Sequence, residues 1–215
     1  MMIKYRLVVW NAAEIGKDKT MARIFIVMGK SATGKDTVYK KLLEAEELHL
    51  KTAVMYTTRP IRRAEKNGIE YYFVDEDTLK RLQQEKKIIE HRSYETIHGT
   101  WHYFTVNDGQ INLEESDYLM IGTLETYTQI SEYFGKDKVV PIYLELEDGV
   151  RLMRAIKREQ KQEQPKYAEM CRRFLADDED FSEENLQKYG ITKRYQNYDI
   201  TICLTEIKAD IKKLL

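Results

Sequence analysis

A glycine-rich segment near the N-terminus holds the residues best suited to chemistry in this chain of 215 residues. It follows the apolar run 24–28 directly and consists of Gly29, Lys30, Ser31, Ala32, Thr33, Gly34, Lys35, Asp36 and Thr37. Glycines five positions apart allow a tight turn that points successive backbone N–H groups into one concavity. A following helix adds partial positive charge there, and Lys35 adds a full charge. The pattern predicts a loop that binds the phosphates of ATP or GTP.

The position after the lysine departs from the usual form of such loops. Ser or Thr normally stands there and binds Mg²⁺ through its hydroxyl, whereas this chain has Asp36 followed by Thr37. Mg²⁺ prefers oxygen ligands, so either residue is a candidate to touch magnesium or phosphate. A plain strand-to-helix turn is the simpler alternative. The apolar run before the loop, and Val38, Leu42 and Ala45 at helical spacing after it, favour the phosphate loop.

A second group of polar residues follows the next apolar run, 52–56. Arg59 and Arg62 lie three residues apart in a turn-rich stretch, and two guanidinium groups there suit bidentate binding of a phosphate dianion. Tyr71 can add a hydroxyl. Glu90 ends an apolar pair, where a carboxylate can accept two N–H bonds from the edge of guanine. Taken singly, each residue is equally explained as solvated surface charge.

Residues 151–173 form a basic stretch with eight Lys or Arg against three Glu. A polar connector, 159–164, lies between two helical patterns in this stretch. Such a segment suits a lid that folds over phosphates. A solvated helical hairpin is the alternative reading of the same composition.

The elements that must position these residues alternate between strand and helix. Strand-like apolar runs lie at 24–28, 52–56, 118–121, 139–144 and 200–204, and helical patterns lie at 36–50, 124–134, 147–158 and 206–214. This alternation predicts an α/β fold of three layers, with a parallel sheet, helices on both faces and ligands at the carboxyl ends of the strands. Segment 70–106 is β-rich apart from a helix at 76–86, which predicts a small insertion over a second substrate.

Composition excludes several classes of protein. Charged residues make up 33% and the net charge is −1, which predicts neither a nucleic-acid partner nor an acidic tail. No run approaches 18 apolar residues, so no membrane span is expected. Cys171 and Cys203 are isolated and the four histidines lack ligand spacing, as in a cytoplasmic protein with reduced thiols. A monomer or homodimer that binds small-molecule nucleotides is expected.

The first twenty residues precede this organisation. Their apolar patch, 7–10, is short and has no small-residue cleavage site, so it does not read as a signal peptide. Met21 stands directly before the first strand. One hypothesis is that Met21 is the natural start and that 1–20 is an extension that is not native or poorly ordered; a genuine extra strand or helix is the alternative. The intact mass of the native protein decides between them.

Taken in order, these motifs resemble the guanylate kinase family of P-loop nucleoside monophosphate kinases. The shared set spans 23–106, with one residue missing between Glu90 and Gly99, and comprises the phosphate loop, Thr57-Thr58-Arg59-x-x-Arg62, Glu65-x-x-Gly68-x-x-Tyr71-x-Phe73, Ile89-Glu90 and His98-Gly99-Thr100. The lid matches more loosely, through Arg154, Arg158 and Arg173.

The resemblance implies a fold, a reaction and a division of the chain. The division is a core at 21–56, 107–150 and 196–215, a nucleoside-monophosphate-binding insertion at 57–106, and a lid with extra helices at 151–195. The reaction is transfer of the γ-phosphoryl group from ATP, with Mg²⁺, to GMP or dGMP, a step of purine nucleotide metabolism.

By the same resemblance, residues of the insertion bind the acceptor and four cations surround the transferring phosphoryl group. The acceptor-binding residues are Arg59, Arg62, Tyr71, His98 and Thr100, with His98 in the place of a family tyrosine, and Glu90 reads guanine. The cations are Lys35, Arg154, Arg158 and Arg173.

Three positions depart from the family pattern. Met55 stands where a serine of the family contacts the base, and Gly122 stands near the place of a family aspartate, for which Glu125 is a candidate substitute. The Asn-Asp pair after the last strand reads Leu204-Thr205. Two alternatives therefore stay open: a kinase for another phosphorylated acceptor, such as ribose 1,5-bisphosphate, and a non-catalytic guanylate-kinase-like binding module. The intact loop glycines and Lys35 favour catalysis.

Overall fold

The computed structural model describes residues 21–96 and 99–215 and has the predicted α/β fold. In chain order its elements are β1 (Ile24–Met28), α1 (Lys35–Leu43), the 3₁₀-helix η1 (Glu46–Leu48), β2 (Tyr56–Thr57), β3 (Tyr72–Phe73), α2 (Glu76–Gln84), β4 (Ile88–Thr96), β5 (Gly99–Val106), β6 (Tyr118–Ile121), α3 (Leu124–Phe134), β7 (Val139–Glu145), α4 (Asp148–Glu159), α5 (Tyr167–Asp180), α6 (Glu183–Lys188), β8 (Arg194–Gln196) and α7 (Ile200–Lys212).

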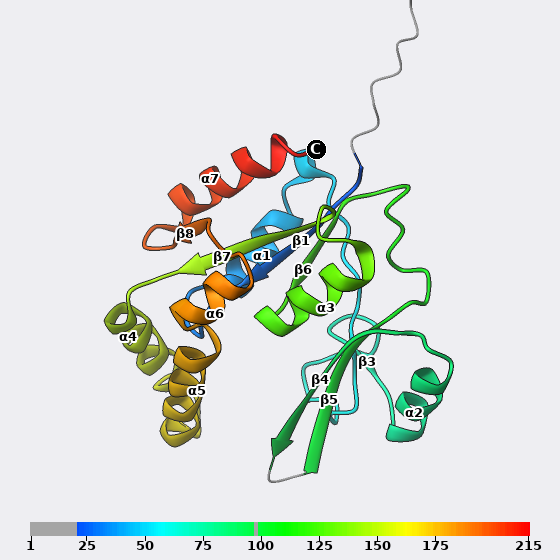
Figure 1. Ribbon diagram of the computed structural model, residues 1–215. Coiled ribbons are helices and arrows are strands. Elements are labelled where there is room, and N and C mark those ends of the chain that lie inside the picture. Colours follow the sequence, from blue (N-terminus) through cyan, green and yellow to red (C-terminus); the bar gives the residue numbers. More distant parts are fainter. Residues whose placement is uncertain (1–20, 97–98) are drawn as a thin grey trace, which may run out of the picture.

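The core is a parallel sheet in the order β6-β1-β7-β8. Central strand β1 is covered on both faces, which is why its sequence is apolar without a break. Its side chains alternate: Ile24, Ile26 and Met28 pack in the layer with α3 and α6, while Phe25 and Val27 pack in the layer with α1 and α7 (Figure 1).

A second sheet, in the order β3-β2-β5-β4, forms the β-rich insertion. Its main part is the antiparallel hairpin of β4 and β5, with α2 packed against it. The carboxylate of Asp75 caps α2 by accepting the N–H of Thr78. Figure 1 shows this insertion and the α4–α5 pair as two separate projections below the core sheet.

The strand expected at 200–204 is wrong, because these residues begin helix α7. Asp199 caps the helix by accepting the N–H groups of Thr201 and Ile202. The buried residues that follow, Cys203, Ile207 and Ile211, repeat every four positions, which is a helical rather than a strand period. The last core strand is instead β8, whose three residues carry no apolar run.

The strand expected at 52–56 is also largely absent. Only Tyr56 and Thr57 form a strand, and they pair in the insertion sheet. Lys51 makes one isolated parallel bridge to Tyr118, and the Val54 N–H donates to the side chain of Gln110. The segment therefore leaves the core sheet and crosses to the insertion.

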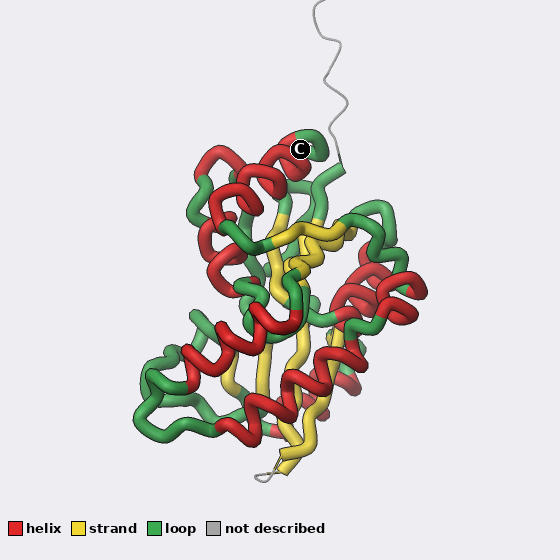
Figure 2. Tube along the Cα trace, turned by 90° about the vertical axis from the view of Figure 1, so that its left-hand side faces the viewer, coloured by secondary structure: helices red, strands yellow, loops and turns green. Residues whose placement is uncertain are grey.

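Helices α4 and α5 pack on each other. Figure 2 shows them at the front, joined by a loop at the edge of the molecule. Across 21–96 and 99–215, no helix combines the length and the hydropathy that a membrane crossing requires.

Candidate active site

Two glycines shape the loop between β1 and α1. A Cβ on Gly29 would lie 2.5 Å from the carbonyl oxygen of Leu144 on β7, and a Cβ on Gly34 would lie 2.6 Å from the Nδ2 of Asn197. Gly34 also has a left-handed φ of +91°. Only glycine fits both places, so the turn depends on the residue type that the sequence supplies there.

Lys35 opens α1 at the mouth of this loop. Burial lowers the pKa of Lys35, and the nearby carboxylates of Asp36 and Asp177 only partly offset that effect. Arg158 and Arg151 lie close enough to lower the pKa further. A poorly solvated cation beside two other cations is an environment that an anionic ligand stabilises.

Asp36 and Thr37 lie exposed in the first turn of α1. Among the described residues, no three His, Cys, Asp or Glu side chains converge on a point that would hold a metal ion. The side chains of Asp36 and Thr37 are oxygen donors, the kind of ligand that Mg²⁺ prefers.

Asn197 is a residue of the site that sequence reasoning missed. It follows β8 directly, is 3% exposed, and its Nδ2 donates to the Thr33 carbonyl of the loop at 2.6 Å. Leu204-Thr205 was assigned to the place of the Asn-Asp pair that follows the last strand in the family. That assignment is wrong, because Leu204 and Thr205 lie inside α7, as does the strand expected at 200–204. The signal that would have found it is the Asp199 cap, which requires the last strand to end before it.

Arg151 was also missed, since it reads as one of many basic residues. It is fully buried on α4, its Nε donates to the Ser31 carbonyl at 3.2 Å, and its Nη1 donates to Asp148 at 2.6 Å. The guanidinium stacks over the ring of Phe174 at 4.5 Å. Within the described part of the chain, its buried Nη2 has no hydrogen-bond partner. Arg151 therefore joins α4, α5 and the phosphate loop.

Two neighbouring carboxylates on α5 also contact the loop. The Ser31 N–H donates to Asp177 at 2.7 Å, and the Lys30 ammonium donates to Asp178 at 2.7 Å. Partial burial opposes ionisation of Asp178, but Lys30 outweighs it and the pKa of Asp178 is lowered. We call Asp177, Asp178 and Arg151 the lid latch, because together they hold α4 and α5 on the loop.

The predicted lid arginines have three different surroundings. Arg154 donates to the carbonyl oxygens of Asn197 and Tyr198, at 3.1 and 3.4 Å. Arg158 is exposed on α4 and lies near Lys35. Arg173 binds Glu169 of its own helix at 2.7 Å.

On the insertion, Arg59 forms a buried fork. It is 4% exposed and donates to both carboxylate oxygens of Glu65, at 3.0 and 2.8 Å. Its guanidinium lies over the rings of Tyr71 and Phe73, with centroids at 5.6 and 5.4 Å. The contact with Arg59 lowers the pKa of Glu65. Arg62 is joined to the same carboxylate through its backbone N–H.

Two further predicted residues, Tyr71 and Thr100, lie near or on the hairpin. Burial raises the pKa of Tyr71, whose ring meets Tyr103 edge-on. Thr100 donates to Glu95 at 2.8 Å near the hairpin turn. Glu95 is five residues along β4 from Glu90, about 17 Å at the usual strand rise. His98 lies outside the described residues, as do residues 1–20.

Glu90 is 1% exposed and does not stand alone. Its two oxygens accept from Arg92, from Nε at 3.1 Å and from Nη2 at 3.3 Å, and Thr105 donates at 3.3 Å. Burial raises the pKa of Glu90, against the opposing effect of Arg92. The partner Arg92 was not foreseen, because an arginine two residues away on a strand gives no sign of pairing before the burial is known.

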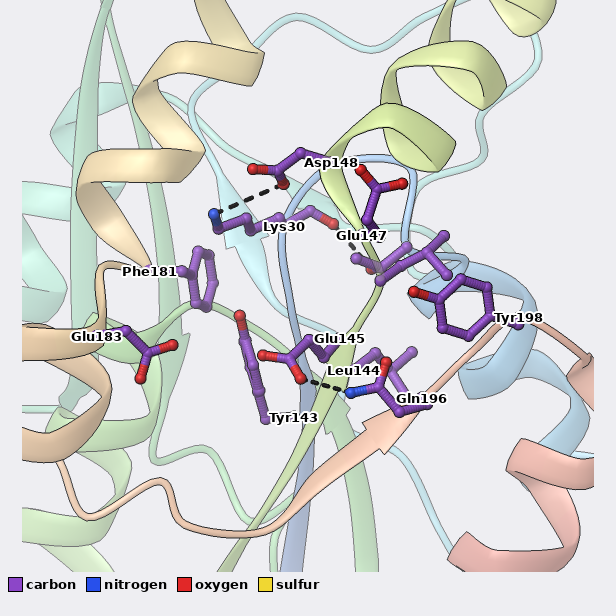
Figure 3. A pocket seen from close by; sticks show the side chains of 12 residues that line it. Lys30, Tyr143, Leu144, Glu145, Glu147, Asp148, Phe181, Glu183, Gln196 and Tyr198 are labelled. Carbon is purple, nitrogen blue, oxygen red and sulfur yellow. Dashed lines mark hydrogen bonds and ion pairs between the residues drawn. The ribbon is translucent and has the colours of Figure 1, made fainter.

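Two cavities lie near these residues, and loop residues line the first of them. One of about 440 Å³, drawn in Figure 3, lies at the carboxyl ends of β7 and β8; its lining includes Lys30 and four carboxylates, of Glu145, Glu147, Asp148 and Glu183. These carboxylates make it a poor place for phosphates. The other, of about 510 Å³, lies between core and insertion and is lined by residues that include Met55, Tyr71 and Met120.

Comparison with known proteins gives one consistent family. The family model described as guanylate kinase matches residues 21–168. The chain is 38% identical over 79 residues to a guanylate kinase of Nitrosomonas europaea, covering 37% of each chain. It is 29% identical over 126 residues to one of Porphyromonas gingivalis, covering 58% of this chain and 65% of the relative. The matches thus span less than two thirds of either relative.

A solved structure agrees at the level of the fold. The crystal structure of guanylate kinase from Anaplasma phagocytophilum superposes with a TM-score of 0.64 at 22% identity, covering 91% of this chain and 87% of that one.

Proposed function

The chain belongs to the guanylate kinase family, and from this we propose that it transfers the γ-phosphoryl group of ATP to GMP or dGMP, giving ADP and GDP or dGDP. The observation that carries the proposal is the phosphate loop with Lys35 at its mouth. Burial lowers the pKa of Lys35 despite Asp36 and Asp177, and Arg158 and Arg151 lower it further, so a bound anion would stabilise the charged ammonium. A non-catalytic binding module has no need of it.

On the donor side, we assign the loop N–H groups and Lys35 to the ATP phosphates. Mg²⁺, when bound, neutralises donor phosphate charge, and Asp36 and Thr37 are its candidate protein contacts. Arg158 faces charge that develops on the transferring group, and Arg154 lies beside Asn197 where the nucleotide base would enter. We assign no direct contact to Arg173 in the arrangement with Glu169.

On the acceptor side, we assign Arg59, Arg62 and Tyr71 to the acceptor phosphate and Glu90 to the base. The attacking atom is an anionic phosphate oxygen, so no strong general base is needed. Catalysis then consists of positioning two polyanions in line and compensating their charge. Thr100 would join the acceptor site only through movement of the hairpin, and His98 stays a predicted acceptor-binding residue.

We also keep the division into a core, an insertion at 57–106 and a lid at 151–195 as a proposal about moving parts. Closure of insertion and lid over both nucleotides would exclude water, which otherwise competes as phosphoryl acceptor. The partners are then small nucleotides.

The experiment is ADP release from Mg-ATP with a panel of acceptors: GMP, dGMP, AMP, CMP, UMP and ribose 1,5-bisphosphate. We expect turnover with GMP and dGMP only. Turnover confined to another acceptor would keep the kinase and overturn the choice of substrate. Binding of Mg-ATP with no turnover of any acceptor would overturn the proposed reaction.

A further inference from the structure

We propose that Arg92 reads the base of the acceptor nucleotide, by donating a hydrogen bond to the 6-oxo group of guanine beside Met55. The inference rests on the proposed function and deepens it, since it assigns a specificity-determining residue that the motifs do not include. It starts from the position of the guanidinium, which is 8% exposed and lies between Glu90 and Met55.

The first step concerns how many acceptor positions Glu90 has left. A carboxylate offers about four. Arg92 fills one on each oxygen, and Thr105 fills a second on Oε1. Glu90 therefore keeps about one free position, on Oε2, which is enough for one N–H of guanine but not for two. One hydrogen bond to Glu90 would not distinguish guanine from other bases, so the site needs a second residue that contacts the base.

The second step concerns the partner that Arg92 has on the side of Met55. Nη2 of Arg92 donates to Glu90 and also approaches the Sδ of Met55 at 3.7 Å. Glu90 and the Tyr94 hydroxyl also bind this guanidinium. A thioether is a weak acceptor, so the N–H that faces Met55 has the poorest partner of the group. An oxo group of a bound base would replace sulfur with a strong acceptor, and burial makes that exchange worth more than it is in water.

The third step concerns location. Met55 lines the cavity between core and insertion, and Tyr71, assigned above to the acceptor phosphate, lines the same cavity. Burial raises the pKa of the Tyr71 hydroxyl, and Arg92 lies close enough to oppose that rise. The guanidinium thus stands beside the space in which an acceptor held by Tyr71 would place its base. Glu90 accepts and Arg92 donates, which matches the N1–H and 6-oxo groups of guanine and opposes the reversed pattern of adenine.

The test compares GMP with 6-thioguanosine 5′-monophosphate, which keeps N1–H and the 2-amino group but replaces the 6-oxo oxygen with sulfur. We expect kcat/KM of the unmodified protein to favour GMP, and the Arg92→Met change to reduce that preference about 10-fold, chiefly through loss of GMP turnover. Arg92→Lys keeps a cation beside Glu90 and should reduce the preference less. Arg81→Met removes an exposed arginine of the same insertion and should leave it unchanged.

A merely structural role for Arg92 would lower turnover of both acceptors by the same factor, and that result would overturn the inference. Circular dichroism checks folding, and Arg92→Lys carries the test if Arg92→Met does not fold. If the unmodified protein turns over neither acceptor, calorimetric binding of the two replaces kcat/KM. A preference that then depends on Arg92 would support the inference while the proposed reaction fails; absence of GMP binding would overturn both.

Discussion

At the scale of single residues, the site is built around charges that the fold keeps from water. Lys35 is the clearest case, because its pKa is lowered by burial in spite of two nearby carboxylates. Burying this cation lowers the free energy of unfolding, and a bound phosphate offsets that loss. Lys35 should therefore raise turnover and lower stability.

We expect Lys35→Met to lower kcat by about 100- to 1,000-fold, the usual effect of removing one preorganised charge from a transition state. The melting temperature should stay the same or rise, since a poorly solvated cation is replaced by an apolar chain. Lys40→Met, on the exposed side of the same helix, is the matched control and should change neither. Near-normal turnover of the Lys35 variant would contradict the assignment of the loop.

The lowered pKa of Lys35 also predicts a pH dependence. Below that pKa the ammonium is charged and binds the triphosphate fully; above it, binding must first take up a proton, so the affinity for Mg-ATP falls. The fall should begin at a lower pH than the ordinary lysine value of about 10.4. Calorimetry in buffers of different ionisation enthalpy measures the proton uptake directly. The same slope in Lys35→Met would assign the effect to another group.

At the scale of elements, the sequence was most informative where a site is contiguous. The phosphate loop, α3 and the β-rich segment follow from local spacing alone. Asn197 and Arg151 reach the loop from 164 and 120 residues away, so no local pattern marks them. The strand expected at 200–204 shows the reverse error: an apolar run was given more weight than the Asp199 cap before it. The roles proposed for Arg59, Tyr71 and Glu90 remain predictions.

The lid latch belongs to this scale, because it decides how α5 meets the loop. Asp177→Asn with Asp178→Asn removes two negative charges from the border of the phosphate site and from the surroundings of buried Arg151. We expect a lower melting temperature and faster amide exchange in α5, together with Mg-ATP binding that is tighter by about 2- to 10-fold.

Asp180→Asn, which removes a charge near the end of the same helix, is the matched control for the latch. It should leave Mg-ATP affinity and exchange in α5 as they are. Weaker Mg-ATP binding in the double variant would mean that the two carboxylates assist the nucleotide rather than compete with it.

At the scale of the whole molecule, the two sheets differ in how much they bury. Both faces of the core sheet pack extensive apolar layers, whereas the described core of the insertion is Leu79, Leu82, Phe104 and Val106. Fewer buried contacts mean a lower free energy of local opening. The part of the molecule that we propose to move over an acceptor is therefore also the part with the smaller apolar core.

Native-state hydrogen exchange should therefore show lower protection in the insertion sheet than in the core sheet. We expect amides of β5 to exchange through partial opening, at a lower free energy than amides of β1, whose side chains are fully buried. Phe104→Ala should lower protection in β4 and β5 and leave β1 nearly unchanged at low denaturant. Equal loss of protection in both sheets would show that insertion and core open as a single unit.

The central place of β1 in the core sheet has a consequence for folding during synthesis on the ribosome. Among residues 21–96 and 99–215, β1 pairs only with strands that begin at Tyr118 and Val139, so about 90 residues must be synthesised after it before the first of these partners is made. At ordinary rates, synthesis of these residues takes roughly 5–20 s. During this time β1, one of the most apolar segments, has no strand to pair with. The loop that follows it also waits for Asn197. A nascent chain therefore makes its nucleotide-binding residues early and gains the ability to bind nucleotide only near the end of translation.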